Sequence, residues 1–220
     1  MDIVVLAGGL SSERDVSLKS GQMVGEALRS KGHRVVVLDV FMGYTDCECD
    51  VTNIFENSQE ASLKISGISS EAPDIEAVIA SRADKSKSFF GPNVIKICQM
   101  ADVVYMALHG GDGESGKVQA AFDLYGIKYT GTDYRSSAIA MDKNLTKEFF
   151  ERAGIPTPAG AFLKKSERAG FTFEKYPCIV KPNCGGSSIG TTIVNNPSEM
   201  DAALDAAFEW EEEIVIEQFI

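Results

Sequence analysis

The apolar positions at the start of the chain form two continuous runs separated by a stretch with helical spacing. Residues 3–7 and residues 34–40 are the two runs, and each predicts a buried strand. Between them, the loop 7–12 leads into a helix that ends at Gly32. A strand, a helix and a strand in this order make a βαβ unit, which predicts a parallel sheet.

The helix of this unit has its own end signals and an apolar stripe. Ser11 or Ser12 is expected to be its N-cap residue, with Glu13 and Asp15 as acids of the first turn. Negative charge is favourable there because the helix dipole presents partial positive charge at this end. The apolar face that we expect on this helix consists of Val16, Met23, Val24, Ala27 and Leu28.

Residues 41–92 give the weakest pattern in the chain. Segment 46–60 is acidic and polar, and the rest mixes short apolar runs such as 75–79 with polar stretches. We interpret the region as weak strands or hairpins with a mobile loop, and assign no chemistry to it. A clear pattern returns with a helix over 93–100 and a strand over 102–108.

His109 follows the strand 102–108 and begins a glycine-rich segment. Ligands of open α/β proteins bind at the carboxyl ends of such strands, although a lone histidine there is more often structural. A helix comes next, and the strand 127–130 follows it. The residues expected on one apolar face of that helix are Val118, Ala121, Phe122 and Tyr125.

The pattern changes in the second half of the chain. After a helix that runs to Arg152, short apolar runs alternate with turns, which is typical of antiparallel strands. The expected strands are 161–163, 178–180, 189–194 and 214–220. A helix that Ser198 opens, with Asp201 in the capping-box position, runs to Phe208 before the last strand.

These patterns divide the chain near residue 131. We expect an α/β fold with an amino-terminal parallel-sheet domain over residues 1–131 and a smaller α+β domain over residues 132–220. The 220 residues are enough for two modest domains, and 44% of them are hydrophobic, which is enough for packed cores.

Charge and composition exclude several classes of protein. The net charge of −11, without a basic block, argues against a nucleic-acid partner. No apolar run reaches the roughly 18 residues of a membrane span. The N-terminus resembles a strand and not a signal peptide, so we expect a cytoplasmic protein without a membrane partner. Cys47 and Cys49 are too close together for a CxxC metal motif, and the five cysteines are expected to be reduced, mostly buried thiols.

The segment 181–190 is the strongest candidate for chemistry. It lies between two expected strands and predicts a hairpin whose loop carries glycines and two serines. Glycine lets backbone N–H groups approach an anion, and Lys181 adds positive charge at the base of the loop. A polyphosphate fits this chemistry, but an ordinary hairpin tip would have the same composition, so the segment alone leaves both interpretations open.

Two other glycine-rich segments match nucleotide-binding motifs only in part. Segment 8–11 lacks the G-x-G-x-x-G spacing, which argues against a dinucleotide-binding dehydrogenase with Asp39 as its ribose-binding acid. Segment 111–117 matches G-x-x-x-x-G-K, but a P-loop needs serine or threonine after the lysine, and valine stands there. Asp112 and Glu114 would also repel a phosphate.

Together, the motifs resemble those of the D-alanine–D-alanine ligase family, a member of the ATP-grasp superfamily, over the whole chain. The matching segments are 7–9, 11–17, 109–110, 113–114, Gly116, 141–143, 181–182, 186–190 and Glu217. The resemblance implies a Rossmann-like, pre-ATP-grasp domain followed by half of an ATP-grasp fold. It also implies ATP-driven ligation of two D-alanines, through a D-alanyl phosphate, for peptidoglycan precursor synthesis.

The resemblance further implies roles for individual residues. Glu13 would orient the amino group of the first D-alanine, His109 would lie beside that substrate, and Ser187 would act with Glu13 in its activation. Lys143 and Lys181 would neutralise the phosphates of ATP. The other expected nucleotide-binding residues are Gly186, Ser187 and Ser188 in the loop, and Glu217, Gln218, Phe219 and Ile220 in the segment that holds adenine.

Some expectations from the resemblance concern parts that this chain does not contain. Mg²⁺ is expected as a second cofactor, with its ligands in a third domain beyond Ile220, so we expect a fragment that is inactive alone.

Ser115 stands where the family usually has aspartate, but the resemblance assigns no substrate-binding or catalytic role to this position. D-Lactate or D-serine as the second substrate, and a non-catalytic nucleotide-binding module, remain open alternatives. The family also implies a homodimer through the amino-terminal domain.

Overall fold

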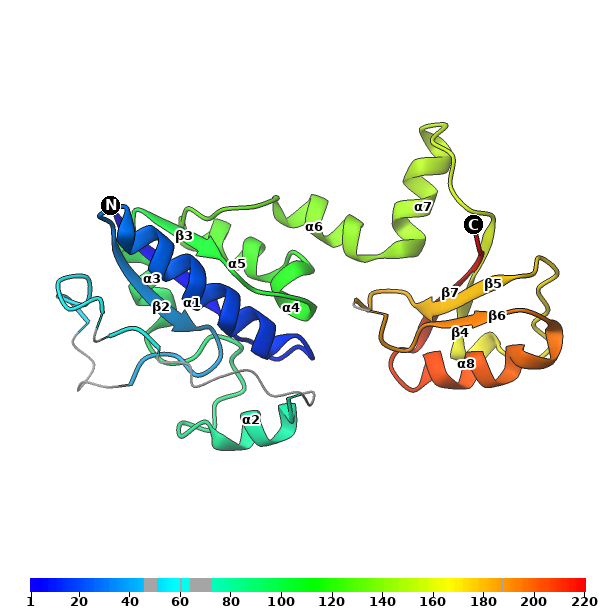
Figure 1. The fold of residues 1–220 in the computed structure, drawn as a ribbon, viewed down its shortest axis with the longest axis horizontal. Helices are drawn as coiled ribbons and strands as arrows, with labels where there is room; N and C mark the ends of the chain where they lie inside the picture. The colour runs from blue at the N-terminus through cyan, green and yellow to red at the C-terminus, as the bar shows by residue number, and fades with distance from the viewer. Residues whose placement is uncertain (46–50, 60, 64–72, 187) are drawn as a thin grey trace. The chain divides into compact units, whose positions relative to one another are not determined.

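The computed structural model describes residues 1–45, 51–59, 61–63, 73–186 and 188–220. Its contacts divide the chain into two compact units, Met1–Arg135 and Ser136–Ile220. The first unit holds a parallel sheet and the second an antiparallel sheet, so the expected α/β fold class is confirmed (Figure 1). Within the described ranges, no helix is both long and apolar enough to cross a membrane.

The sheet of the first unit consists of β1 (Asp2–Ala7), β2 (Arg34–Asp39) and β3 (Val103–Met106), in the order β2-β1-β3. β1 is parallel to both of its neighbours, as the βαβ pattern predicts. Almost every residue of β1 and β2 is buried, because both faces of the sheet are covered.

Helices cover both faces of this sheet. Helix α1 (Arg14–Ser30) packs on one face, against a cluster that includes Val5 and Val37 (Figure 1). Helices α3 (Val94–Met100) and α5 (Lys117–Tyr125) pack on the other. In α5, Val118 and Phe122 are buried as expected, whereas the Tyr125 side chain is exposed.

The expected apolar face and N-cap of α1 are wrong in part. Val24 and Leu28 pack on the sheet as expected, but Val16 and Met23 are 49% and 59% exposed. The buried positions at the closest approach to the sheet are Ser17, Gly21 and Gly25. A Cβ on Gly21 would lie 2.6 Å from the Cβ of Ala7, so the helix packs too closely for a larger residue. The N-cap is Glu13, not Ser11 or Ser12, and its side chain makes no capping hydrogen bond.

The strands or hairpins expected within residues 41–92 are not found in the described part of that range. Its apolar run forms helix α2 (Ile75–Ser81), because the Asp74 carboxylate accepts a hydrogen bond from Ala77 N and caps the helix. Residues 46–50, 60 and 64–72 lie outside the described residues. The strand expected at 127–130 is reduced to a single bridge between Tyr129 and Val104.

Two helices lead into the second unit, whose sheet is antiparallel. Helix α6 (Tyr134–Met141) spans the boundary, and α7 (Lys143–Arg152) follows. The strand order is β4-β7-β5-β6, and β5 and β6 form the expected hairpin. The strands are β4 (Gly160–Lys164), β5 (Cys178–Pro182), β6 (Thr192–Val194) and β7 (Glu213–Gln218).

Helix α8 (Met200–Phe208) packs on one face of this sheet, against a core that includes Val180 and Ile216 (Figure 1). The expected N-cap Ser198 is wrong. The Asn196 side chain accepts a hydrogen bond from Ser198 N at 3.2 Å, which opens a 3-10 turn before α8. Because strand side chains alternate between faces, the face opposite α8 carries Ile179 and Lys181 of β5 and Val215 and Glu217 of β7.

Candidate functional site

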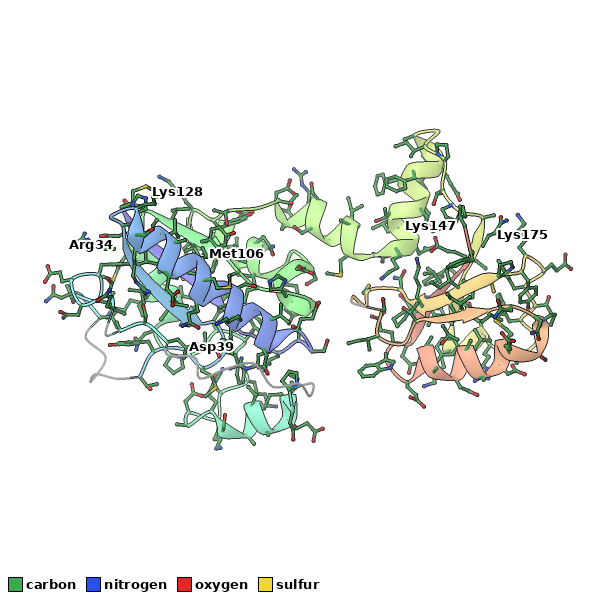
Figure 2. All side chains as sticks on the ribbon, in the orientation of Figure 1. Arg34, Asp39, Met106, Lys128, Lys147 and Lys175 are labelled. Carbon is green, nitrogen blue, oxygen red and sulfur yellow. The ribbon has the colours of Figure 1, made fainter. Side chains whose placement is uncertain are left out.

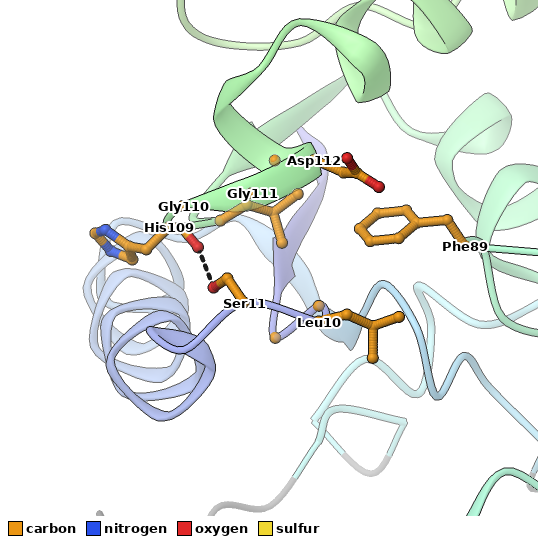
Figure 3. Close-up of a pocket in the computed structure, with 11 residues that line it drawn as sticks. Leu10, Ser11, Phe89, His109, Gly110, Gly111 and Asp112 are labelled. Atoms are coloured by element: carbon orange, nitrogen blue, oxygen red, sulfur yellow. Dashed lines mark hydrogen bonds between the residues drawn. The ribbon is translucent and has the colours of Figure 1, made fainter. Parts of the chain in front are cut away.

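Two glycine-rich loops line a pocket of about 150 Å³ at the carboxyl edge of the parallel sheet (Figure 3). One loop follows β1, and the other connects β3 to the short helix α4 (Gly111–Glu114). The lining consists of residues 8–11 and 108–113 together with Phe89. Open parallel sheets bind their ligands at this edge, so the pocket is a candidate substrate site.

Ser11 ties the two loops together. Its hydroxyl donates a hydrogen bond to the backbone oxygen of His109 and accepts one from Glu13 N at 3.2 Å (Figure 3). The Glu13 carboxylate lies beside Gly110, since a Cβ added to Gly110 would be 2.8 Å from Glu13 Oε2. The imidazole of His109 points away from Phe89 (Figure 3). Glu13 and His109 therefore lie at the same edge of the sheet.

A buried polar network holds the first glycine loop in place. Arg14 forms an ion pair with Asp39 and donates a second hydrogen bond to Gly9 O at 2.7 Å. Asp39 also accepts hydrogen bonds from the backbone N–H groups of the two residues that follow Val40. Ser17 Oγ donates to Ala107 O at 2.7 Å and so connects α1 to the other loop. Asp39 thus has a structural role within the protein.

The lysine of the second glycine segment faces an acid. Lys117 Nζ lies 2.6 Å from Asp112 Oδ1 in an exposed ion pair. Gly116 has a φ of +85°, and a Cβ there would lie 2.2 Å from Tyr134 O, so this glycine serves the backbone turn. Both observations agree with a turn at the sheet edge and not with a phosphate-binding P-loop.

In the second unit, Lys143 is fixed at the base of the loop that follows β5. It is the first residue of α7, where Asp142 caps the helix by accepting from Leu145 N at 2.8 Å. Its ammonium donates to Asn183 O at 3.1 Å and to Gly185 O at 2.5 Å. Burial lowers the pKa of Lys143, and the nearby charge of Lys181 lowers it further, while Glu211 opposes both effects.

Lys181 is joined to two other charged groups on the face of the sheet opposite α8. Glu217 pairs through one carboxylate oxygen with Lys181 and through the other with Lys147, at 2.8 Å. Lys147 lies on α7 (Figure 2). Burial alone would raise the pKa of Glu217, but the hydrogen bonds from the two lysines lower it below its usual value. The cluster is a concentration of positive charge in an acidic chain.

The loop between β5 and β6 is held at both ends and needs its glycines. Cys184 N donates to Glu211 Oε2 at 2.7 Å. Gly190 has a φ of +66°, and a Cβ there would lie 2.7 Å from Trp210 Cδ1. Gly186 and Ser188 are exposed on the loop, while Ser187 lies outside the described residues. The loop therefore presents backbone and hydroxyl groups from a defined base.

The segment from Glu217 to Ile220 forms the end of β7 and the residues after it. Gln218 N donates to Ala159 O at 2.8 Å, and Phe219 N donates to Pro177 O at 3.0 Å. These two bonds fix the backbone path, and the Ile220 side chain is exposed. Contacts of this segment with adenine stay a prediction.

Comparison with known proteins decides the family. A family model described as the D-ala D-ala ligase N-terminus matches residues 2–132, and one described as the D-ala D-ala ligase C-terminus matches residues 149–220. The chain belongs to the D-alanine–D-alanine ligase family. This confirms the resemblance that its motifs indicated.

Several ligases of this family are similar to the chain over its full length. The D-alanine–D-alanine ligase of Lacticaseibacillus casei is 42% identical over 100% of this chain and 61% of the relative. That of Pediococcus pentosaceus is 45% identical over 100% of this chain and 63% of the relative. The chain thus spans about three fifths of the length of these relatives.

Solved structures of ligases also match. The crystal structure of D-alanine–D-alanine ligase from Bacillus anthracis has a TM-score of 0.65 and 30% identity, covering 100% of this chain and 58% of that one. A structure of the ligase from the same organism in complex with ATP has a TM-score of 0.65 and 28% identity, covering 100% of this chain and 59% of that one. The neighbours support the ATP-grasp assignment of the fold.

The structure groups the ligase-family residues into two sets. Glu13 and His109 lie at the same edge of the parallel sheet in the first unit, where Glu13 is next to Gly110. Lys143, Lys181 and Glu217 meet in the second, next to the loop that carries Gly186 and Ser188. The expected action of Ser187 with Glu13 stays a prediction.

Sequence reasoning missed the residues that support these sets. Arg14 and Ser17 lie within the matching segment 11–17 but have no assigned role there, and nothing in the local sequence distinguishes Lys147, four positions after Lys143. Asn183 is buried and accepts from Asn144 N at 2.9 Å, so it connects the loop to α7. A polar residue between a strand and a glycine loop is the only signal that could have drawn attention to it.

Proposed function

We propose that this chain is part of a ligase that uses ATP to join two D-alanines into D-alanyl-D-alanine for peptidoglycan precursor synthesis. Membership of the ligase family and similarity over the whole of this chain to about three fifths of known ligases support the proposal. The structural observation that carries it is the cluster of Lys143, Lys181 and Glu217 at the base of a glycine-rich loop.

The second unit would bind ATP. Lys143 and Lys181 would neutralise the phosphates, and backbone N–H groups of the loop that follows β5 would cover them. The main chain of residues 217–220 would contact adenine. Closing the loop over the phosphates would exclude water that would otherwise hydrolyse an acyl phosphate.

The first unit would bind the first D-alanine. The Glu13 carboxylate would hold its ammonium group, with His109 beside it and Ser187 completing the site. A carboxylate oxygen of this D-alanine attacks the γ-phosphorus of ATP, and ADP leaves. The amine of the second D-alanine then attacks the acyl carbon, loses a proton and expels phosphate. Charge on the transferring group is stabilised by the lysines.

Mg²⁺ is usual in phosphoryl transfer because it neutralises the phosphates. Among the residues that the structure describes, no group of three or more His, Cys, Asp or Glu side chains is placed to hold a metal ion. No described residue is therefore assigned as a ligand of Mg²⁺.

The first test measures D-alanine-dependent phosphate release with ATP and Mg²⁺, on this chain and on the product of its complete reading frame. The proposal expects release by the complete product and loss of release in its Lys181→Met variant. Lys164→Met is the matched control, because Lys164 pairs with Glu213 at an exposed position on the same sheet. ATP binding without D-alanine-dependent release by the complete product would refute the ligase assignment.

Further parts of the proposal need separate measurements. Replacing the second D-alanine by D-lactate or D-serine in the same assay identifies the acceptor. A homodimer through the first unit would appear in sedimentation of the chain. We place the enzyme in the cytoplasm, where ATP is available, and cell fractionation would test this.

A further inference from the structure

Two lysines pair with one carboxylate in the second unit, and the surroundings of these lysines differ. Lys147 Nζ contacts Glu217 Oε1 at 2.8 Å, Thr157 Oγ1 at 3.1 Å and the backbone oxygen of Pro158. A lysine ammonium has three N–H donors, so these three partners use all of them. The side chain of Lys147 is also only 14% exposed. Lys147 is therefore not available to a phosphate.

Lys181 has the opposite surroundings. Its side chain is 26% exposed, and within the described residues it pairs with the other carboxylate oxygen of Glu217. It therefore keeps donors for a ligand that reaches its exposed ammonium. Glu217 is 9% exposed in its side chain and links the two lysines directly.

The charges of the three groups decide what Lys181 can do. A carboxylate with a single lysine partner would cancel that lysine's charge and hold it in place. Because Lys147 is a second partner of Glu217, the group of two lysines and one carboxylate keeps a net positive charge. Glu211, the other carboxylate near Lys143, is engaged with Cys184 N at 2.7 Å.

We propose that Lys147 is a positioning residue that neutralises and anchors Glu217, so that the ammonium of Lys181 remains available to a nucleotide phosphate. The inference rests on the proposed function, because it takes the ligand of Lys181 to be the phosphates of ATP. Lys147 itself does not touch the nucleotide. Its effect on binding passes through Glu217.

The test compares ATP with adenosine, which lacks the phosphates, by isothermal titration calorimetry on the 220-residue chain. Lys147→Met should weaken ATP binding about tenfold, because an unbalanced carboxylate then faces Lys181 in a medium of reduced dielectric constant. Adenosine binding should change less than about twofold, since adenosine has no phosphate and the contacts expected between residues 217–220 and adenine are made by the main chain. Lys147→Arg keeps the charge and should retain ATP affinity within about threefold.

Two further variants separate this role from a structural one. Lys147→Met/Glu217→Gln removes both charges, so ATP affinity should recover to within about threefold of the parent. Lys164→Met removes another lysine paired with a glutamate of β7, at 3.0 Å, and makes the same change in net charge. Glu213 is four residues from Glu217, about 13 Å along the strand, which is beyond the Debye length at physiological salt, so this control should bind ATP normally.

The outcomes distinguish the two proposals. Equal loss of ATP and adenosine affinity in Lys147→Met, or failure of both the arginine and the double variant to restore ATP binding, would show that Lys147 only supports the fold. Unchanged ATP affinity in a folded Lys147→Met would also overturn the inference while leaving the ATP site intact. A parent chain that binds neither ATP nor adenosine would instead overturn the proposed nucleotide site, and this role of Lys147 with it.

Discussion

Breaking the Arg14–Asp39 ion pair should destabilise the first unit strongly, because the pair is buried. The side chains are 9% and 1% exposed. Asp39 would keep two backbone donors, Phe41 N at 2.9 Å and Met42 N at 3.1 Å, but its charge would have no cation. Removing one partner of a buried pair typically costs roughly 3–5 kcal/mol. We expect Arg14→Met to lower the free energy of unfolding by about 3 kcal/mol, since those backbone donors remain.

A second arginine–aspartate pair provides the matched control. Arg34 and Asp2 join β2 to β1 with a closest distance of 2.6 Å, but their side chains are 56% and 22% exposed. Exposed pairs contribute little because water screens them, so Arg34→Met should stay within about 1 kcal/mol of the parent. The contrast between the two variants measures the effect of burial on the same chemistry.

The assay is urea denaturation with two probes. The single tryptophan, Trp210, lies in the second unit, so its fluorescence follows that unit. Far-ultraviolet circular dichroism follows both units. Arg14→Met should shift the dichroism transition of the first unit to lower urea and leave the tryptophan transition unchanged.

A double variant tests the coupling between the two side chains. Arg14→Met/Asp39→Ala should cost less than the sum of the two single variants, because neither charge is then left alone. Additive costs, or an Arg14→Met variant no less stable than Arg34→Met, would refute the reasoning.

Three further predictions concern packing, thiol chemistry and pH. Gly21→Ala should destabilise the chain by roughly 1–3 kcal/mol in thermal or urea unfolding despite the better helix propensity of alanine, because the new Cβ would overlap with the sheet; a more stable variant would contradict the close approach of α1. Burial raises the pKa of Cys98 to about 12, so Cys98 should react with a thiol reagent only on unfolding, whereas the exposed Cys184 should react in the native chain. Mass spectrometry of the labelled peptides measures which of the two cysteines has reacted. Burial would raise the pKa of Glu217, but its two lysine partners lower it, so the stability it adds is complete above the usual glutamate pKa and is lost as pH falls through the lowered value. Stability of Glu217→Gln should therefore fall less with acid than that of the parent, and parallel curves would contradict the prediction.

Much of the fold followed from the sequence because its hydrophobic runs are unambiguous. The runs at 3–7 and 34–40 became β1 and β2, and the apolar run at 178–180 became part of β5. Residues buried on both sides must be apolar at every position, and this leaves a clear signal. The apolar run at 75–79 was too short to distinguish a strand from a helix, and the cap at Asp74 decided the outcome.

The packing face of α1 could be predicted only in part from apolar spacing, which correctly selected Val24 and Leu28. The helix also meets the sheet through Ser17, Gly21 and Gly25, which contribute almost nothing to a hydrophobic pattern. These small residues are needed because the backbones approach closely. The larger apolar residues Val16 and Met23 are consequently directed outward.

In the candidate site, the roles of the charged residues also could not be predicted from local sequence alone. Motif matching selected Lys143 and Lys181, but it could not separate them from Lys147, which has the same chemistry and lies on the same helix as Lys143. What separates them is how many of their donors the folded chain already uses. Lys147 uses its three N–H donors for partners within the protein, whereas Lys181 pairs with the Glu217 carboxylate and stays partly exposed. That difference arises only when β7 places Glu217 between α7 and β5, so the role of a lysine in this site is fixed by tertiary contacts and not by its local sequence.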